Sequence, residues 1–259
     1  MTVVIGLKSP EDIVLAADRE ESDSYLRHQV QKIQRLRFPN EMIAAITGDG
    51  DAHFIDFATD KIADYLQTHP EVPISRVGAG IETVLKGIVT EHTFATNLPA
   101  RERPDFGLLV GCNHRGASKL FKTHYAAPLE VVDFAASGAG ASYAEILLRK
   151  FWGTLTLHSA VLLSLYVVHQ TQKHVCTVGG GTDVVILKAD GKSATMFSAL
   201  TKPLNEKLEK LDYQFEGAFF SALYGVTWAH DADDFRNKVA QTRGELQGEL
   251  DQFFKALNV

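Results

Sequence analysis

The chain alternates blocks of short strands with pairs of helices, and this order restricts its fold more than any other feature. Two β-branched runs at 2–8 and 12–18 are joined by a turn-like "SPE" segment, and runs at 30–38 and 41–48 are joined by "PN". Strands that follow one another through such short turns pair antiparallel. The first part of the chain therefore predicts two hairpins.

The apolar pattern then changes to helical spacing. Apolar residues three and four apart predict helices at 51–67 and 74–92, and again at 142–151 and 157–173. The further strands expected from the sequence are 105–112, 118–125, 129–136, 183–189 and 193–199.

Nearly every expected strand can reach the next through a hairpin, so two antiparallel sheets with helices packed outside are the economical arrangement. We therefore predict an α+β fold, a four-layer α/β/β/α sandwich, over residues 1–200. Residues 201–259 are predicted to form a C-terminal helical extension. Its apolar stripe can either cover the core or bind a partner in an assembly, and it consists of Phe235, Val239, Leu246, Leu250 and Phe254.

Composition narrows the functional classes. The net charge of −6, without a Lys/Arg-rich run, argues against a nucleic-acid partner. Cys112 and Cys176 are too few for a disulfide framework, which favours a reducing compartment. No apolar stretch approaches the roughly 20 residues of a membrane span, and "MTVVIG" lacks the features of a secretory signal. We therefore expect a cytoplasmic protein with no membrane partner.

Thr2 carries the most distinctive chemistry near the start of the chain. Met before a small residue is normally excised, and this would leave Thr2 with a free α-amine whose pKa is about 7.7–8.0. Such an amine can accept the proton of the Thr hydroxyl, so that base and nucleophile share one residue. If the first strands pair as predicted, Asp18 and Lys32 can approach Thr2. The Lys would stabilise a developing alkoxide, and the Asp would hold the Lys.

These residues resemble a known family. The stretches "TVVIGLKSPEDIVLAADRE", "VQKIQRL", "AAITGDGDAHFIDF" and "GGGTDVVILKADG" are similar to those of proteasome β-type and related bacterial peptidase subunits. These are N-terminal-nucleophile hydrolases with an α/β/β/α sandwich. The resemblance spans roughly residues 2–190, which is most of the expected core.

The resemblance implies a role for several residues. Thr2 matches the nucleophile, with its own amine as the base, Asp18 matches the conserved Asp, and Lys32 matches the activating Lys. Gly48 matches the Gly whose backbone N–H forms the oxyanion hole. The positions that fall near the specificity pocket are Glu21, Val30, Ile46 and Gly50.

The sequence also departs from the family pattern. The family usually has a Ser in a "GSG"-like turn, and the gapless match in "SGAGASYA" places Ala139 there. Ser137 could substitute if the loop shifts by two residues. The family's second Asp and its Ser match Val175 and Val178. The Thr–Asp–Lys set is therefore kept, whereas part of its supporting shell is missing.

We therefore predict a threonine-type peptidase subunit that acts on peptides or unfolded proteins, without organic cofactor or metal. The resemblance implies a homo-oligomer, in a ring or related multimer, and leaves open whether an ATP-dependent unfoldase feeds it. Two alternatives remain. One is a catalytically inactive scaffold subunit of the same fold, suggested by Ala139, Val175 and Val178. The other is an N-terminal-nucleophile amidase acting on a small amide.

Overall fold

A computed structural model describes residues 2–22, 27–94, 105–153, 155–224 and 232–256 of the chain. It divides into two compact units, Met1–Phe197 and Ser198–Val259. The boundary expected between residues 200 and 201 falls inside helix α5 (Ser198–Tyr224). The first unit contains both large sheets and four long helices, and the second contains two helices.

The first sheet of the larger unit has five antiparallel strands in the order β10-β1-β2-β11-β12. The hairpin predicted at 2–8 and 12–18 is confirmed, because β1 and β2 pair antiparallel with Val4 opposite Ala17. The strands of this sheet are β10 (Phe134–Ser137), β1 (Val4–Lys8), β2 (Ile13–Asp18), β11 (Thr182–Leu187) and β12 (Ser193–Met196).

The second sheet also has five antiparallel strands, in the order β5-β6-β7-β8-β9. The hairpin predicted at 30–38 and 41–48 is confirmed as β5 and β6. The strands of this sheet are β5 (Ile33–Arg37), β6 (Ile43–Gly50), β7 (Phe106–His114), β8 (Ala117–His124) and β9 (Ala127–Val131). A separate two-stranded sheet, not expected from the sequence, joins β3 (Glu20–Ser22) to β4 (Arg27–Gln29).

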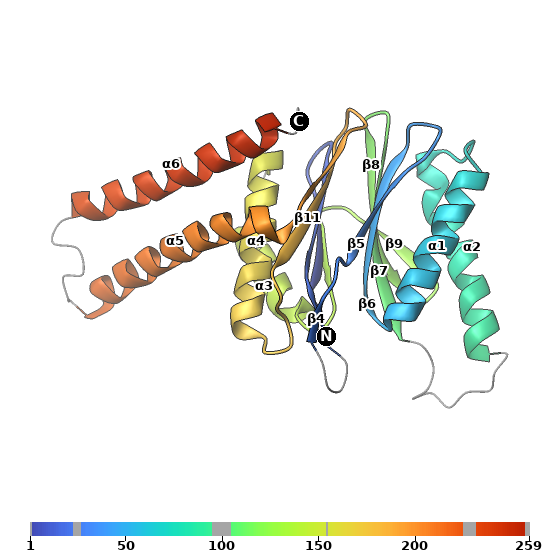
Figure 1. Ribbon diagram of the computed structural model, residues 1–259, viewed down its shortest axis with the longest axis horizontal. Helices are drawn as coiled ribbons and strands as arrows, with labels where there is room; N and C mark the ends of the chain where they lie inside the picture. Colours follow the sequence, from blue (N-terminus) through green and yellow to red (C-terminus); the bar gives the residue numbers. More distant parts are fainter. Residues whose placement is uncertain (1, 23–26, 95–104, 154, 225–231, 257–259) are drawn as a thin grey trace. The chain divides into compact units, whose positions relative to one another are not determined.

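Two pairs of helices enclose the two sheets, as Figure 1 shows. Helices α1 (Ala52–Thr68) and α2 (Val77–Val89) lie on the second sheet, and α3 (Ala141–Phe151) and α4 (Leu157–His174) lie on the first. A 3₁₀ turn, η1 (Ile74–Arg76), and a π-helical turn, η2 (Thr90–Phe94), flank α2. The predicted four-layer α/β/β/α sandwich is confirmed.

The core between the sheets is apolar and fully buried, with Ile13, Leu15, Leu109, Leu120 and Val185 at its centre. Every residue of β2 is buried, because one face of this strand meets the other sheet and the other face meets α4. A strand covered on both sides has no solvent-facing position. This explains why "IVLAAD" is a continuous apolar run up to its terminal Asp.

The single strand predicted over 129–136 is wrong. The chain leaves β9 at Val131 and enters β10 at Phe134, and these strands belong to different sheets. Val132 is 78% exposed at the crossing, and the Asp133 carbonyl accepts a 2.8 Å hydrogen bond from the Lys8 N–H. The stretch "LEVVDFAA" contains neither Gly nor Pro, so the strongest turn signals are absent at the point where the chain passes between the sheets.

The expected strand at 193–199 ends at Met196, and helix α5 begins at Ser198. In the smaller unit, α5 and α6 (Ala232–Ala256) form an antiparallel hairpin. The Lys207 ammonium pairs with Glu249, and Gln214 Nε2 donates to Thr242 Oγ1 at 3.4 Å. Of the predicted stripe, three residues are buried and Val239 is half-buried, whereas the Phe235 side chain lies outside the described residues; the buried three are Leu246, Leu250 and Phe254.

In the part of the chain that the structure describes, none of the helices has the length and apolarity needed to cross a membrane.

The inter-sheet core should dominate the stability of the larger unit. Ile13 is 0% exposed, so Ile13→Ala removes buried contacts, and we expect its free energy of unfolding to fall by about 2–5 kcal/mol. Urea denaturation measures this loss. Ile146→Ala is the matched control: Ile146 is 63% exposed on α3, and its loss should stay within about 0.5 kcal/mol. Equal losses for the two variants would contradict the core assignment.

Candidate active site

Thr2, Asp18 and Lys32 meet at one end of the two sheets. The β1–β2 register, with Val4 opposite Ala17, places Thr2 beside Asp18 at the end of β2. Lys32 comes from the other sheet, immediately before β5. Thr2 Oγ1 donates to Asp18 Oδ1 at 2.7 Å, and Lys32 Nζ donates both to Thr2 Oγ1 and, at 2.9 Å, to Asp18 Oδ1. The structure therefore brings together the three residues that the sequence singled out.

Asp18 is the buried centre of this cluster, with 0% of its surface exposed. A buried carboxylate is tolerated only when charges and hydrogen bonds compensate it. Both of its oxygens are hydrogen-bonded, Oδ1 by three donors and Oδ2 by two. These donors are Thr2 Oγ1 (2.7 Å), Val3 N (2.9 Å), Lys32 Nζ (2.9 Å), Glu20 N (3.3 Å) and Gly179 N (3.2 Å).

Lys32 directs its ammonium at the Thr2 hydroxyl. Its side chain is 12% exposed, and burial lowers its pKa although the Asp18 carboxylate opposes this shift. The Glu20 carbonyl oxygen accepts a further hydrogen bond from Nζ at 2.5 Å. An ammonium held against a hydroxyl oxygen stabilises the alkoxide form of that hydroxyl. The arrangement can therefore activate Thr2 as a nucleophile.

Gly48 lies on β6 opposite Leu108 and lines the same cavity as Thr2. A Cβ at this position would lie 2.6 Å from the carbonyl oxygen of Gly107 and 2.9 Å from a methyl group of Leu108. Backbone cannot move aside as a flexible side chain can, so only glycine fits.

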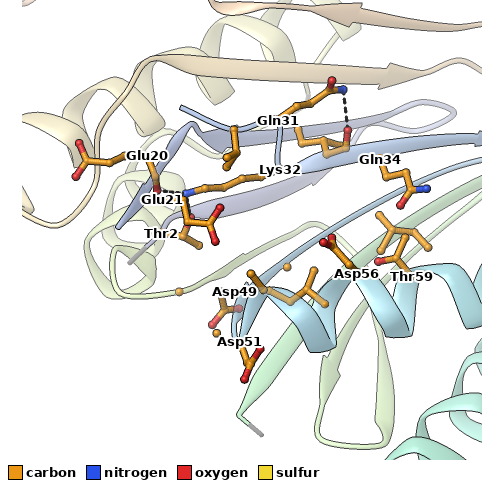
Figure 2. Close-up of a pocket in the computed structure, with 18 of the residues that line it drawn as sticks. Thr2, Glu20, Glu21, Gln31, Lys32, Gln34, Asp49, Asp51, Asp56 and Thr59 are labelled. Atoms are coloured by element: carbon orange, nitrogen blue, oxygen red, sulfur yellow. Dashed lines mark hydrogen bonds between the residues drawn. The ribbon is translucent and has the colours of Figure 1, made fainter. Parts of the chain in front are cut away.

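The cavity beside Thr2 has a volume of about 1050 Å³ (Figure 2). Its walls come from the segment around β5, from the end of β6 and the start of α1, and from the turn after β10. Asp18 lies buried behind Thr2 and does not line it. Of the residues that the sequence predicted for the site, those that line the cavity are Thr2, Glu21, Val30, Lys32, Ile46, Gly48 and Gly50.

Ser137 lies outside the Thr2 cluster. It is the last residue of β10, opposite Val4, and its side chain interacts with Asp49. In the described part of the chain no hydrogen bond joins Ser137 to Thr2. The next residues, Gly138 and Ala139, line the cavity instead.

The turn after Ser137 packs directly on Thr2. Gly138 has φ +91°, and a Cβ there would lie 2.3 Å from the Thr2 carbonyl oxygen. The same oxygen accepts a hydrogen bond from the Gly140 N–H at 3.2 Å. This turn therefore holds Thr2 through its backbone, where the family pattern has a serine hydroxyl.

Sequence reasoning missed the backbone donors of the site. Gly179, in the glycine run after α4, gives its N–H to Asp18 Oδ2, while Val178 beside it is buried and supplies no polar side chain. The run "GGG" was the available signal, since consecutive glycines allow close backbone approach.

Among the residues with described positions, no group of three or more His, Cys, Asp or Glu side chains could hold a metal ion.

Asp49 is a second carboxylate of the site that the sequence reasoning did not single out. Burial raises its pKa, and Asp105 adds to this shift, whereas Ser137 and Lys122 oppose it. It follows Gly48 directly on β6 and lines the cavity. A change in its protonation would therefore alter the charge of the cavity wall beside Gly48.

A four-layer sandwich with Thr, Asp and Lys clustered at the end of its first strands has the fold of the N-terminal-nucleophile hydrolases. The chain belongs to the proteasome family, because the family model described as "Proteasome subunit" matches residues 2–187. A curated relative, Proteasome subunit alpha 1 of Haloferax volcanii, is 26% identical over 194 residues, which is 73% of this chain and 73% of the relative.

Two solved structures share the fold. Anbu (ancestral beta-subunit) from Yersinia bercovieri has a TM-score of 0.67 at 14% identity, covering 85% of this chain and 96% of its own. The structure described as the helical assembly of the Anbu complex from Pseudomonas aeruginosa has a TM-score of 0.64 at 14% identity, covering 86% and 96%.

The raised pKa of Asp49 predicts a pH-dependent stability. The folded protein binds this proton more tightly than the unfolded chain, so the stability that protonation provides is lost as pH rises from 3.8 through the raised value. Relative to Asp49→Asn, the wild type should therefore lose stability as pH increases through this window. Urea denaturation at pH 3.5 to 7 measures the difference.

The control for the loss of a negative charge is Asp60→Asn, because Asp60 is exposed on α1. A wild type that gains stability over Asp49→Asn as pH rises would contradict the direction of the shift.

Proposed function

We propose that the chain is a threonine-type peptidase subunit that hydrolyses peptide bonds through Thr2 after removal of Met1. The observation that supports this most directly is the Thr2 hydroxyl, which contacts both the Lys32 ammonium and the Asp18 carboxylate at the wall of a large cavity. Lys32 and Asp18 already pair directly at 2.9 Å, so a purely structural ion pair would not need a hydroxyl that contacts both charges and lines an open cavity.

The proposed reaction begins when Thr2 Oγ1 attacks the carbonyl carbon of a peptide bond. The hydroxyl proton passes to the α-amine of Thr2, which exists once the Met1–Thr2 bond has been cleaved. Lys32 stabilises the negative charge on Oγ1 as the proton leaves, and Asp18 keeps the ammonium in place. Base and nucleophile therefore come from one residue, and their positioning comes from two others.

The carbonyl oxygen becomes an oxyanion, which we propose is stabilised by the Gly48 N–H. When the C–N bond breaks, the leaving amine takes the proton from the α-amine, and an ester joins the acyl group to Thr2. Water then attacks this ester, gives one proton to Thr2 Oγ1 and releases the acid. This series of reaction steps needs no metal or organic cofactor.

We further propose that the subunit works in the cytoplasm as a homo-oligomer, since the similar Anbu of Pseudomonas aeruginosa is described as a helical assembly. In this proposal, an ATP-dependent unfoldase is the partner that would deliver unfolded protein to the assembly. Native mass spectrometry of the full chain distinguishes an assembly from a 28.5 kDa monomer.

A catalytically inactive scaffold subunit is the second candidate. It is favoured by the position of Ser137 away from Thr2, and by Ala139 and Val178, which bring no hydroxyl to the site. The two candidates differ in whether Thr2 reacts.

Covalent labelling of Thr2 tests the peptidase proposal. A peptide epoxyketone or vinyl sulfone should add one inhibitor mass to Thr2, located by peptide mapping, and intact mass should show that Met1 is absent. Thr2→Ala should abolish both the label and peptide hydrolysis, whereas Thr2→Ser should keep a fraction of each because it retains a hydroxyl.

Hydrolysis that is unchanged in Thr2→Ala would refute the mechanism. A retained Met1 with an unlabelled Thr2 would favour the scaffold, and activity confined to small amides would favour an amidase.

The lowered pKa of Lys32 predicts that the rate of Thr2 labelling falls at alkaline pH. Lys32 should lose its proton below the ordinary 10.5, and the rate of Thr2 labelling should fall there because the neutral amine no longer stabilises the alkoxide. In Lys32→Arg the guanidinium stays charged, so this fall should disappear even if the overall rate is lower. Lys86→Arg, at an exposed position on α2, is the control. The same fall at alkaline pH in Lys32→Arg would show that another group titrates.

A further inference from the structure

We propose that the cavity beside Thr2 selects peptides with a lysine or arginine side chain, and that Asp56 of α1 binds the cationic end of that side chain. This inference rests on the proposed function, because it names the substrate class of the same site. The evidence for it is the set of side chains that line the cavity between strands β5 and β6 and helix α1.

The subsite has an apolar floor and polar walls. Gln34 on β5 pairs with Ile46 on β6, so both side chains project from the same face of the sheet, which is the face that α1 covers. Ile46 is 1% exposed and forms the floor, together with Ile55 of α1. Figure 2 shows Asp56 and Thr59 projecting from α1 toward the strand that carries Gln34.

Gly48 extends the floor of this subsite toward Thr2 without a side chain of its own. The part of the cavity that leads from Thr2 to α1 is therefore apolar at its floor and ends at the Asp56 carboxylate. Lysine and arginine match this profile, because their methylene stems pack on apolar surface while the charged end reaches a polar group. A leucine would fill the floor and leave Asp56 without a counter-charge.

The charge of the cavity wall also favours a cationic substrate side chain. Five carboxylates and two cations line the cavity. Lys32 is engaged by Asp18 and Thr2, and Arg35 directs one nitrogen to the Ser193 carbonyl oxygen at 3.2 Å on the other sheet. Neither cation is therefore placed to neutralise the α1 side of the cavity.

The five carboxylates differ in what they already bind. Glu20 pairs with Arg27 at 3.2 Å, Asp51 accepts the N–H groups of His53 and Phe54 at the start of α1, and Asp49 interacts with Ser137 and Lys122. Within the described residues, Asp56 and Glu21 form no ion pair. Asp56 is thus the uncompensated carboxylate on the α1 wall, and Glu21 adds negative charge from the side of Lys32.

Binding of matched peptides to the full-length Thr2→Ala protein tests the inference without requiring hydrolysis. The probes are two fluorescent peptides that differ only in arginine or citrulline at the residue whose carbonyl Thr2 would attack. Citrulline keeps the shape of arginine and lacks its charge. We expect its Kd, measured by fluorescence anisotropy, to be about 1.4-fold to fivefold higher, because an exposed ion pair contributes a free energy of that size.

Asp56→Asn, added to the same protein, should reduce the arginine-to-citrulline ratio to near one. Asp60→Asn removes one charge from the next turn of α1, outside the cavity, and should keep the ratio. Asp56→Lys should reverse the preference, so that a glutamate peptide binds more tightly than the arginine peptide.

Equal binding of the arginine and citrulline peptides would overturn the inference, and so would an equal effect of Asp56→Asn and Asp60→Asn. Failure of the proposed function gives a different result. In that case Thr2 of the wild type would remain unlabelled by the electrophilic peptide, while the charge-dependent binding would still be present.

Discussion

The site depends on the burial of one carboxylate. Asp18 is fully buried at the end of β2, and five donors from separate segments converge on it. Such a charge is stable only if all these segments keep their places, so the compensation of Asp18 also fixes Thr2 and Lys32. The position of the nucleophile is therefore a consequence of how the sandwich satisfies this buried charge.

The two sheets contribute different parts of the site. The first sheet supplies Thr2 and Asp18 through the β1–β2 hairpin, and the second supplies Lys32 and Gly48 at the β5–β6 edge. The apolar layer between the sheets holds these edges together. The cavity lies where β6 runs into α1, so its floor belongs to the apolar core and its walls carry charge.

Backbone groups occupy places where the family pattern has side chains. Gly138 and Gly140 contact the Thr2 carbonyl oxygen, and Gly179 donates to Asp18. Ala139 and Val178 thus lie in segments that still touch the Thr2–Asp18 pair. Backbone contacts therefore hold Thr2 and Asp18 in place without a side-chain hydroxyl from these segments.

The sequence by itself determined the strand and helix blocks and the two first hairpins, because these follow from local periodicity and turn residues, and its resemblance to proteasome subunits pointed to Thr2, Asp18 and Lys32. Only the tertiary structure decided that 129–136 crosses between sheets, that Ser137 interacts with Asp49, and that Asp56 faces the cavity. These features depend on which distant segments pack together. Neither the crossing from β9 to β10 nor an N–H aimed at a carboxylate leaves a local pattern in the sequence.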